Sequence, residues 1–148
     1  MYQFSSKAKK KEIFISFNYT DDKNYRYLLN ALAKNTESPV EFEDYTPSEI
    51  KSYDVGRIKA ALTRRIKDAD YTLVVIGANA NQRHPDYKEI GTRNWQWWEI
   101  EKAVDEGHKF IAVKIKNANP TPDPLKNRGA TWARSYNVQA IAKAIDDA

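Results

Sequence analysis

One short stretch, residues 94–100 (NWQWWEI), gathers side chains that could do chemistry, since three of the four tryptophans surround one carboxylate, Glu99. If the stretch is helical, Trp95 and Glu99 lie on one face about one turn apart. A carboxylate can oppose a developing positive charge, and an indole ring can hold a planar or cationic group against its π face. A neighbouring face carries a predicted core-facing stripe: Trp97, Ile100 and Val104. The stretch therefore predicts a helix that packs on the core and holds an aromatic ring beside an acid.

These residues also have purely structural interpretations. Glu99 could be an exposed carboxylate near a helix N-terminus, where the helix dipole stabilises negative charge. Trp97 and Trp98 are expected to pack in the core or an interface, and Trp95 could pack or contact a ligand. Residue types and spacing alone leave these alternatives open.

Composition indicates an ordinary globular protein. The 148 residues suit a single domain, 1–148, in which 1–10 form a flexible basic tail. Hydrophobic residues make up 41% and charged residues 30% of the chain, as in soluble proteins. The chain has no apolar run of the roughly 18 residues that a membrane span needs, and the run after the basic tail is too short for a signal peptide. We therefore expect a cytoplasmic protein without a membrane partner.

Several kinds of site are excluded or disfavoured by the residue counts. The chain has no cysteine, which excludes disulfides and a cysteine nucleophile, and its two histidines argue against a metal site. The net charge of +4 could indicate nucleic-acid binding, but the basic residues are scattered and mostly accompanied by acids. Solvated surfaces, or attraction of a small anion such as a dinucleotide, explain the charge better, and no nucleic-acid partner is expected.

Apolar periodicity predicts strands that alternate with helices. The predicted strands are residues 11–17, 40–42, 71–76 and 109–115, with a weaker signal near 132–136. The predicted helices cover 24–34, the stripe of Ile58, Leu62 and Ile66, residues 94–106, and the stripe of Val138, Ile141, Ala142 and Ile145. This order predicts a flavodoxin-like α/β three-layer sandwich, with a central, mostly parallel sheet of four to five strands and helices on both faces.

The two longest connections fall where such a fold binds ligands. Residues 44–56, which end at Gly56, and residues 77–93 are long for loops in a compact domain, and such loops tend to be functional. Together with residues 18–22, they follow the carboxyl ends of predicted strands, the edge at which open α/β sheets hold ligands. The helix of residues 94–106, which ends before Gly107 as a predicted C-cap, begins at the same edge.

Four motifs, in order, resemble those of the Toll/interleukin receptor (TIR) domain family, in particular its bacterial branch that includes Thoeris anti-phage defence proteins. They are IFISFNYTDD, FEDY with YDVGRI, IKDADYTLVVIG and NWQWWEI, which together cover residues 11–115. Ala69 stands where many relatives have Ser. The segment 116–137, with prolines at 120, 122 and 124, matches the family poorly.

The resemblance implies an enzyme that cleaves the nicotinamide N-glycosidic bond of NAD. Its product would be ADP-ribose, or a cyclic or otherwise derivatised ADP-ribose signal, in anti-phage defence. The family's catalytic glutamate aligns with Glu99. Its substrate-binding positions align with Trp95, Phe17, Asn18 and Tyr45, although Asn18 could be only a turn residue and Tyr45 only a loop anchor.

The residues present suit that chemistry. Nicotinamide in NAD is cationic and leaves as a neutral molecule, so it needs no general acid, unlike the leaving group of an O-glycoside. One carboxylate suffices to stabilise the oxocarbenium-like ribose. NAD is then the substrate and no cofactor or metal is expected; the chain also lacks the G-x-G-x-x-G and P-loop patterns.

The resemblance also implies partners and leaves alternatives. Active relatives complete their site across a subunit contact, so a homo-oligomer is expected, at least transiently, and a nucleotide signal would reach an effector protein. One alternative is a non-enzymatic TIR adaptor that acts by self-association. Another is a nucleoside-processing transferase, because a glutamate-dependent N-glycosidic site on an α/β sheet also suits deoxyribosyl transfer.

Overall fold

The computed structural model describes residues 10–18, 25–43 and 54–148. Within them, five strands form one sheet in the order β2-β1-β3-β4-β5, and every neighbouring pair is parallel. The strands are β1 (Lys11–Phe17), β2 (Val40–Glu43), β3 (Tyr71–Ile76), β4 (Lys109–Lys114) and β5 (Thr131–Trp132). The predicted flavodoxin-like α/β fold is therefore confirmed.

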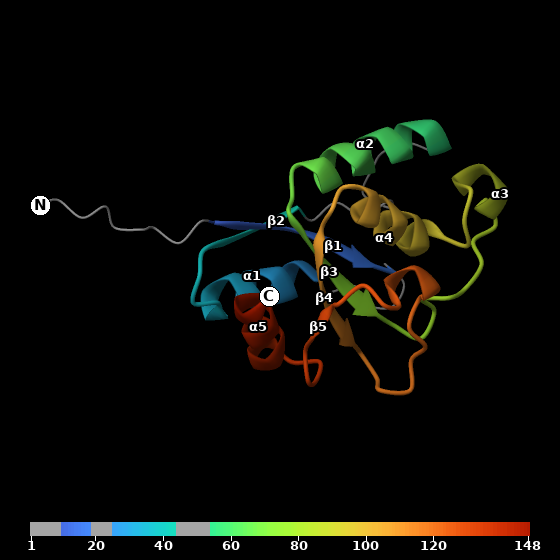
Figure 1. Ribbon diagram of the computed structural model, residues 1–148. Coiled ribbons are helices and arrows are strands. Elements are labelled where there is room, and N and C mark those ends of the chain that lie inside the picture. The colour runs from blue at the N-terminus through green and yellow to red at the C-terminus, as the bar shows by residue number, and fades with distance from the viewer. Residues whose placement is uncertain (1–9, 19–24, 44–53) are drawn as a thin grey trace, which may run out of the picture.

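Helices cover both faces of the sheet. The helices α1 (Tyr25–Asn35) and α5 (Val138–Asp147) lie on one face, and α2 (Val55–Lys67) and α4 (Trp95–Asp105) lie on the other (Figure 1). Two single-turn elements, α3 (Tyr87–Ile90) and the 3₁₀ helix η2 (Asp123–Leu125), interrupt the connections. None of the helices in the described ranges is long and apolar enough to cross a membrane.

The alternation of side chains along the strands divides the core in two. Leu73 and Val75 of β3 pack toward α1 and α5, whereas Val74 and Ile76 pack toward α2 and α4. All four are at most 4% exposed, which explains why this strand is an unbroken apolar run. Burying each such side chain contributes roughly 1.5–3 kcal/mol.

The same alternation sends neighbouring side chains of β1 to opposite faces of the sheet. Phe17 belongs to the cluster under α1 and α5, and Phe14 belongs to the cluster under α2 and α4. Ser16 is fully buried and projects to the α2/α4 side, where it bonds a residue of α4. A polar side chain is thus placed in an apolar layer at the carboxyl edge of the sheet.

Most predicted boundaries are confirmed within a residue or two. The strand predicted near 132–136 is shorter and lies earlier, as β5 (Thr131–Trp132), and three further elements differ. Gly56 lies in the first turn of α2 rather than at the end of a loop, because the Asp54 carboxylate caps the helix by accepting from the Arg57 main-chain N–H at 2.9 Å. The short α3 and η2 carry too few residues for periodicity to reveal them. The C-cap of α4 is Glu106, one residue before the predicted Gly107, which has φ of 75° and lies just beyond the helix.

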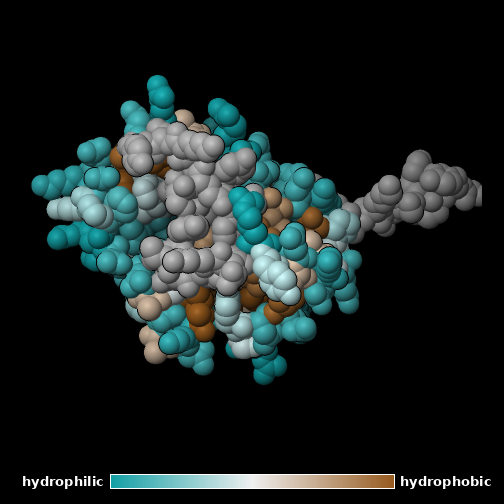
Figure 2. Space-filling view, turned by 180° about the vertical axis from the view of Figure 1, so that it is seen from behind, coloured by the Kyte–Doolittle hydropathy of each residue, from teal (hydrophilic) through white to brown (hydrophobic). Residues whose placement is uncertain are grey.

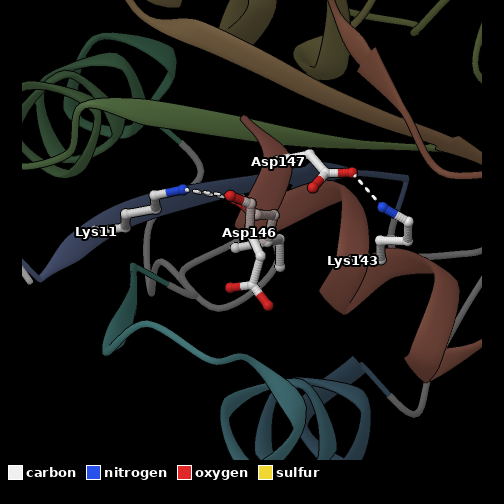
Figure 3. A network of polar contacts seen from close by, with 5 residues as sticks. Lys11, Lys143, Asp146 and Asp147 are labelled. Atoms are coloured by element: carbon white, nitrogen blue, oxygen red, sulfur yellow. Dashed lines mark hydrogen bonds and ion pairs between the residues drawn. The ribbon is translucent and has the colours of Figure 1, made fainter.

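The end of α5 is fixed to the start of β1. Lys11 Nζ donates to the main-chain oxygens of Ile145 at 2.7 Å and Ala148 at 3.1 Å. Figure 3 shows the Lys11 side chain pointing toward the end of α5, where Asp146 lies. Carbonyl groups in the last turn of a helix have no partner within the helix, and a cation there complements the helix dipole. The Asp146 carboxylate accepts from the main-chain N–H of Glu37 at 2.9 Å. These bonds join the first strand, the last helix and the connection between α1 and β2.

The surface is largely polar. On the side seen in Figure 2, hydrophilic side chains predominate and hydrophobic residues show between them in small areas. Among the described residues, the large hydrophobic side chains that are exposed are Tyr27 at 80% and Trp132 at 44%.

Candidate active site at the β1/β3 edge

Helix α4 is held at its first turn by Asn94. The Asn94 Oδ1 accepts from the Trp97 main-chain N–H at 2.9 Å and so caps the helix. Its Nδ2 donates to the main-chain oxygens of Ala80 and Gln82, each at 2.8 Å. Because Asn94 bonds both the helix and the segment that follows β3, it fixes where α4 begins and how it is rotated about its axis.

The buried face of α4 includes Ile100 of the predicted stripe, and Val104 packs at its edge, but Trp97 departs from the prediction. The buried residues are Gln96, Glu99, Ile100 and Ala103, at the helical spacing i, i+3, i+4 and i+7. Trp97, which the spacing assigned to the core, donates its indole Nε1 to Asn81 Oδ1 at 3.0 Å and lies beneath the Arg93 guanidinium. The Asn94 cap sets the rotation of α4 about its axis, and the polar side chains of Gln96 and Glu99 therefore take core positions.

Glu99 is buried in the core layer. Its side chain is 1% exposed, and its Oε1 accepts a hydrogen bond from Ser16 Oγ at 2.7 Å. Burial raises the pKa of Glu99 to about 8, and the Ser16 hydrogen bond opposes this rise only in part. None of the ion pairs between described residues includes Glu99. The carboxyl group therefore holds its proton at neutral pH in the free protein.

Gln96 lies one turn before Glu99 and ties two strands together. Its Nε2 donates to the main-chain oxygens of Ser16 at 3.0 Å and Val75 at 2.9 Å. These carbonyls stand near the carboxyl ends of β1 and β3. The chain leaves these two strands in opposite directions across the sheet, so they form the topological switch point at which such sheets bind ligands.

The other end of the Gln96 amide has no partner among the residues that the structure describes. Gln96 is 3% exposed, and its Oε1 is buried without a hydrogen bond from any described residue. Rotating the amide would only turn the oxygen toward two carbonyls, so the orientation is fixed by the hydrogen bonds. Since buried acceptors are nearly always satisfied, this oxygen is a candidate contact for a ligand donor or a water molecule.

The predicted substrate-binding residues occupy different positions. Phe17 is 5% exposed and packs under α1 and α5, on the sheet face opposite to Glu99. Asn18 follows β1, and its Nδ2 donates to the main-chain oxygen of Asn79 at 3.3 Å, which places it at the carboxyl edge beside β3. Tyr45 lies outside the described residues. The roles of these residues stay predictions.

Trp95 is partly buried at the rim of the α2/α4 cluster. It packs edge to face against Trp98, with ring centroids 5.9 Å apart. The structure therefore brings Glu99, Gln96 and Ser16 into one hydrogen-bonded group and sets the two tryptophans beside them on the same helix. Trp98 packs against the core as predicted, whereas Trp97 is not part of that cluster. The role of Trp95 in substrate binding stays a prediction.

Two members of this group, Ser16 and Gln96, are absent from the sequence-based site. Their signal is polarity in an apolar context, a hydroxyl in the strand IFISF and an amide in NWQWWEI. Among the described residues, no cluster of three or more acidic or histidine side chains could hold a metal ion. The chemistry available to the site is thus that of a protonatable, buried carboxyl group with an amide acceptor beside it.

Comparisons with known proteins identify the family of the chain and agree with its fold. A family model described as "Thoeris protein ThsB, TIR-like domain" matches residues 14–120. A prokaryotic SEFIR domain superposes with a TM-score of 0.55 at 19% identity, covering 93% of this chain and 94% of its own. The CMP N-glycosidase of Clostridium botulinum superposes with a TM-score of 0.52 at 15% identity, covering 93% and 100%. At these identities the two structures show a shared fold. No curated protein matches the sequence.

Burial of Glu99 predicts a pH-dependent stability. In the folded state the carboxyl keeps its proton up to about pH 8, whereas an exposed glutamate loses it near 4.5. The folded protein thus binds more protons between these values, and this group makes the free energy of unfolding fall by about 1.4 kcal/mol per pH unit as the pH rises. Glu99→Gln removes this contribution, so the variant should gain stability relative to the natural protein between pH 5 and 8, as measured by urea unfolding.

Glu101→Gln is the matched control, because Glu101 is an exposed carboxylate two residues along the same helix. Its stability difference from the natural protein should stay constant over that range. A constant difference for Glu99→Gln as well would mean that Glu99 titrates like an exposed glutamate.

Proposed function

Since the chain belongs to the TIR-like domain family of the Thoeris protein ThsB, we propose that it cleaves the bond between nicotinamide and ribose in NAD. The observation that carries the proposal is Glu99, a carboxyl group shielded from solvent and held by Ser16 at the switch point of the sheet. A buried titratable group with a strongly shifted pKa is typical of a functional site.

The proposed reaction uses Glu99 in its ionised form. The C–N bond breaks, its electron pair leaves with nicotinamide, which becomes neutral, and the ribose C1′ takes up positive charge. A carboxylate beside that carbon stabilises the charge, the more so because water is excluded. Attack by water gives ADP-ribose and a proton, and attack by an atom of the substrate itself gives a cyclic product.

Substrate binding would convert the Glu99 carboxyl group to its ionised form. In the free protein the raised pKa keeps the Glu99 carboxyl neutral at pH 7. The pyridinium ring of NAD brings a positive charge, and an opposite charge within a few ångströms lowers the pKa of a carboxyl group. Binding of NAD therefore promotes release of the proton. Because Glu99 is buried, access of the substrate also requires the site to open, as active sites with closing segments commonly do.

Gln96 completes the proposed site as a substrate acceptor. Its Nε2 is occupied by two main-chain carbonyls, and its unpartnered Oε1 lies one helical turn from Glu99. A ribose hydroxyl or the carboxamide N–H of nicotinamide would satisfy this oxygen. A site that hydrogen-bonds a substrate donor in this way rejects analogues that lack the donor.

The biological setting follows from the family. In anti-phage defence, the ADP-ribose product, linear or cyclic, would act as a signal to an effector protein. A second copy of the chain would complete or open the site, so assembly of at least a transient homo-oligomer would control turnover.

The proposal predicts that Glu99→Gln abolishes nicotinamide release from NAD. Loss of the charge that stabilises C1′ should lower kcat by at least about 100-fold, measured by chromatography of nicotinamide and ADP-ribose products under conditions that favour assembly. Glu101→Gln, on the exposed side of the same helix, should retain the activity of the natural protein.

Unchanged turnover in Glu99→Gln would remove Glu99 from its role. If assembled protein shows no turnover of NAD, the adaptor alternative is favoured. Release of cytosine from CMP without release of nicotinamide would instead indicate a nucleotide N-glycosidase like the Clostridium botulinum protein of the same fold.

The role of Gln96 predicts a coupling between protein and substrate. NAD analogues that lack the carboxamide N–H, the 2′-hydroxyl or the 3′-hydroxyl of the nicotinamide ribose remove one donor each. For the analogue that lacks the donor bound by Gln96, the natural protein should lose at least about tenfold in kcat/KM. Gln96→Met should show no further loss with that same analogue, because the acceptor is already gone.

Equal losses for every analogue in both proteins would contradict the contact. That outcome would leave Gln96 with the structural task of joining β1 and β3, without bearing on Glu99.

A further inference from the structure

A second concave site lies at the carboxyl ends of β4 and β5. We call this site the β4–β5 groove. Its cavity of about 220 Å³ is lined by Lys114, Asn117, Thr121, Trp132, Ala133, Arg134 and Ser135. Five of these seven residues follow residue 120, where the match to the family model ends. The groove is therefore built mainly by the proline-containing segment for which the family resemblance gives no role.

The walls of the groove are anchored to the core. Asn119 is 7% exposed, and its Nδ2 donates to the main-chain oxygen of Ile76 at 3.0 Å. Leu125 is 2% exposed and packs in the α2/α4 cluster. On the other side, the Ala133 main-chain N–H donates to the oxygen of Ala112 at 2.8 Å. A segment without regular periodicity is thus held at three points, which gives the groove a preformed shape.

An indole ring and an ammonium group face the groove together. Trp132 pairs with Ala112 in the sheet register, and Lys114 lies two residues further along β4, so both side chains project from the same face. Lys114 Nζ lies 6.0 Å from the centroid of the Trp132 ring. Trp132 nevertheless remains 44% exposed, and an indole ring left open in a concave site offers a surface on which a planar group can stack.

The groove is positively charged and has no counter-charge of its own. Its lining includes no acidic residue, and neither Lys114 nor Arg134 forms an ion pair with a carboxylate among the described residues. Elsewhere on the surface, lysines such as Lys126 and Lys143 pair with nearby aspartates. Two cations without a carboxylate partner among the described residues, beside hydroxyl and amide groups, form a suitable site for an anion with several oxygen atoms.

We propose that the β4–β5 groove binds a small nucleotide, with the phosphate at Lys114 and Arg134 and the base stacked on Trp132. The cavity is below the range of about 300–1,000 Å³ typical of drug-sized ligands, so it encloses the phosphate and sugar while the base rests on the exposed indole. β3 lies between β4 and β1, and β1 carries Ser16, the hydrogen-bond partner of Glu99. The groove is therefore a separate site, and nucleotide binding there does not depend on the proposed cleavage of NAD.

The test is titration of the full chain with AMP, adenosine and ribose 5-phosphate. Binding is monitored through the NMR signal of the Trp132 indole N–H, which is assigned by its absence in Trp132→Ala. AMP should shift this signal. Adenosine, which lacks the phosphate, and ribose 5-phosphate, which lacks the base, should each bind at least tenfold more weakly than AMP. Lys114→Gln should weaken AMP binding at least tenfold, and added salt should weaken it further.

Two control variants localise the binding. Lys126→Gln removes one exposed positive charge outside the groove, and Glu99→Gln alters the proposed catalytic carboxyl group; both should bind AMP as the natural protein does. Trp132→Ala, measured by calorimetry, should lose at least tenfold in AMP affinity while its thermal unfolding shows a folded protein.

Three outcomes would overturn the proposal. The first is an AMP affinity that does not change in Trp132→Ala and Lys114→Gln. The second is binding of inorganic phosphate as tight as that of AMP. The third is that AMP shifts only the NMR signals of α4. Loss of NAD cleavage in Glu99→Gln with intact AMP binding would separate the two sites from each other.

Discussion

The hydrogen bond between Ser16 Oγ and Glu99 Oε1, 2.7 Å long, is the interaction on which the site depends. A carboxyl group cannot be buried in a hydrophobic layer without a partner, because the free energy of its desolvation must be offset. Ser16 provides that partner from β1, and Gln96 adds two hydrogen bonds from α4 to β1 and β3. Together they hold α4 against the carboxyl edge of the sheet and place an ionisable group in a site largely free of water.

The fold makes this arrangement possible. The order β2-β1-β3-β4-β5 sends the chain in opposite directions from β1 and β3, which leaves an edge where main-chain carbonyls and a helix start meet. Asn94 fixes the rotation of α4 there, and that rotation decides which of its side chains enter the core. The raised pKa of Glu99 follows from this position, and with it the requirement that a positively charged substrate promote its ionisation. The β4–β5 groove lies at the same edge of the sheet, with β4 two strands from β1, and it carries cations where the β1/β3 site carries a carboxyl group.

The sequence predicts much of the fold because its signals there are local. β1 and β3 have the predicted bounds, and α4 ends within two residues of Gly107, since unbroken apolar runs and glycine reflect what each segment requires by itself. The rotation of α4 about its axis, by contrast, is determined by contacts with residues outside the helix. It depends on bonds from Asn94 to Ala80 and Gln82, so apolar spacing assigned Trp97 to the core. Ser16 and Gln96 were missed because their partners lie 21 to 83 residues away along the chain. Glu99 was identified by family resemblance and not by spacing.

The central claim is that Glu99 is a buried carboxyl group whose ionisation is coupled to the substrate. The most direct test is NMR titration of the Glu99 side-chain carbon in protein labelled with ¹³C-glutamate, with Glu99→Gln to identify the signal. We predict a pKa of about 8 in the free protein, and a lower pKa when a carbocyclic NAD analogue that cannot be cleaved is bound. A pKa near the ordinary value of 4.5 in the free protein, or one that the bound analogue does not change, would contradict the claim.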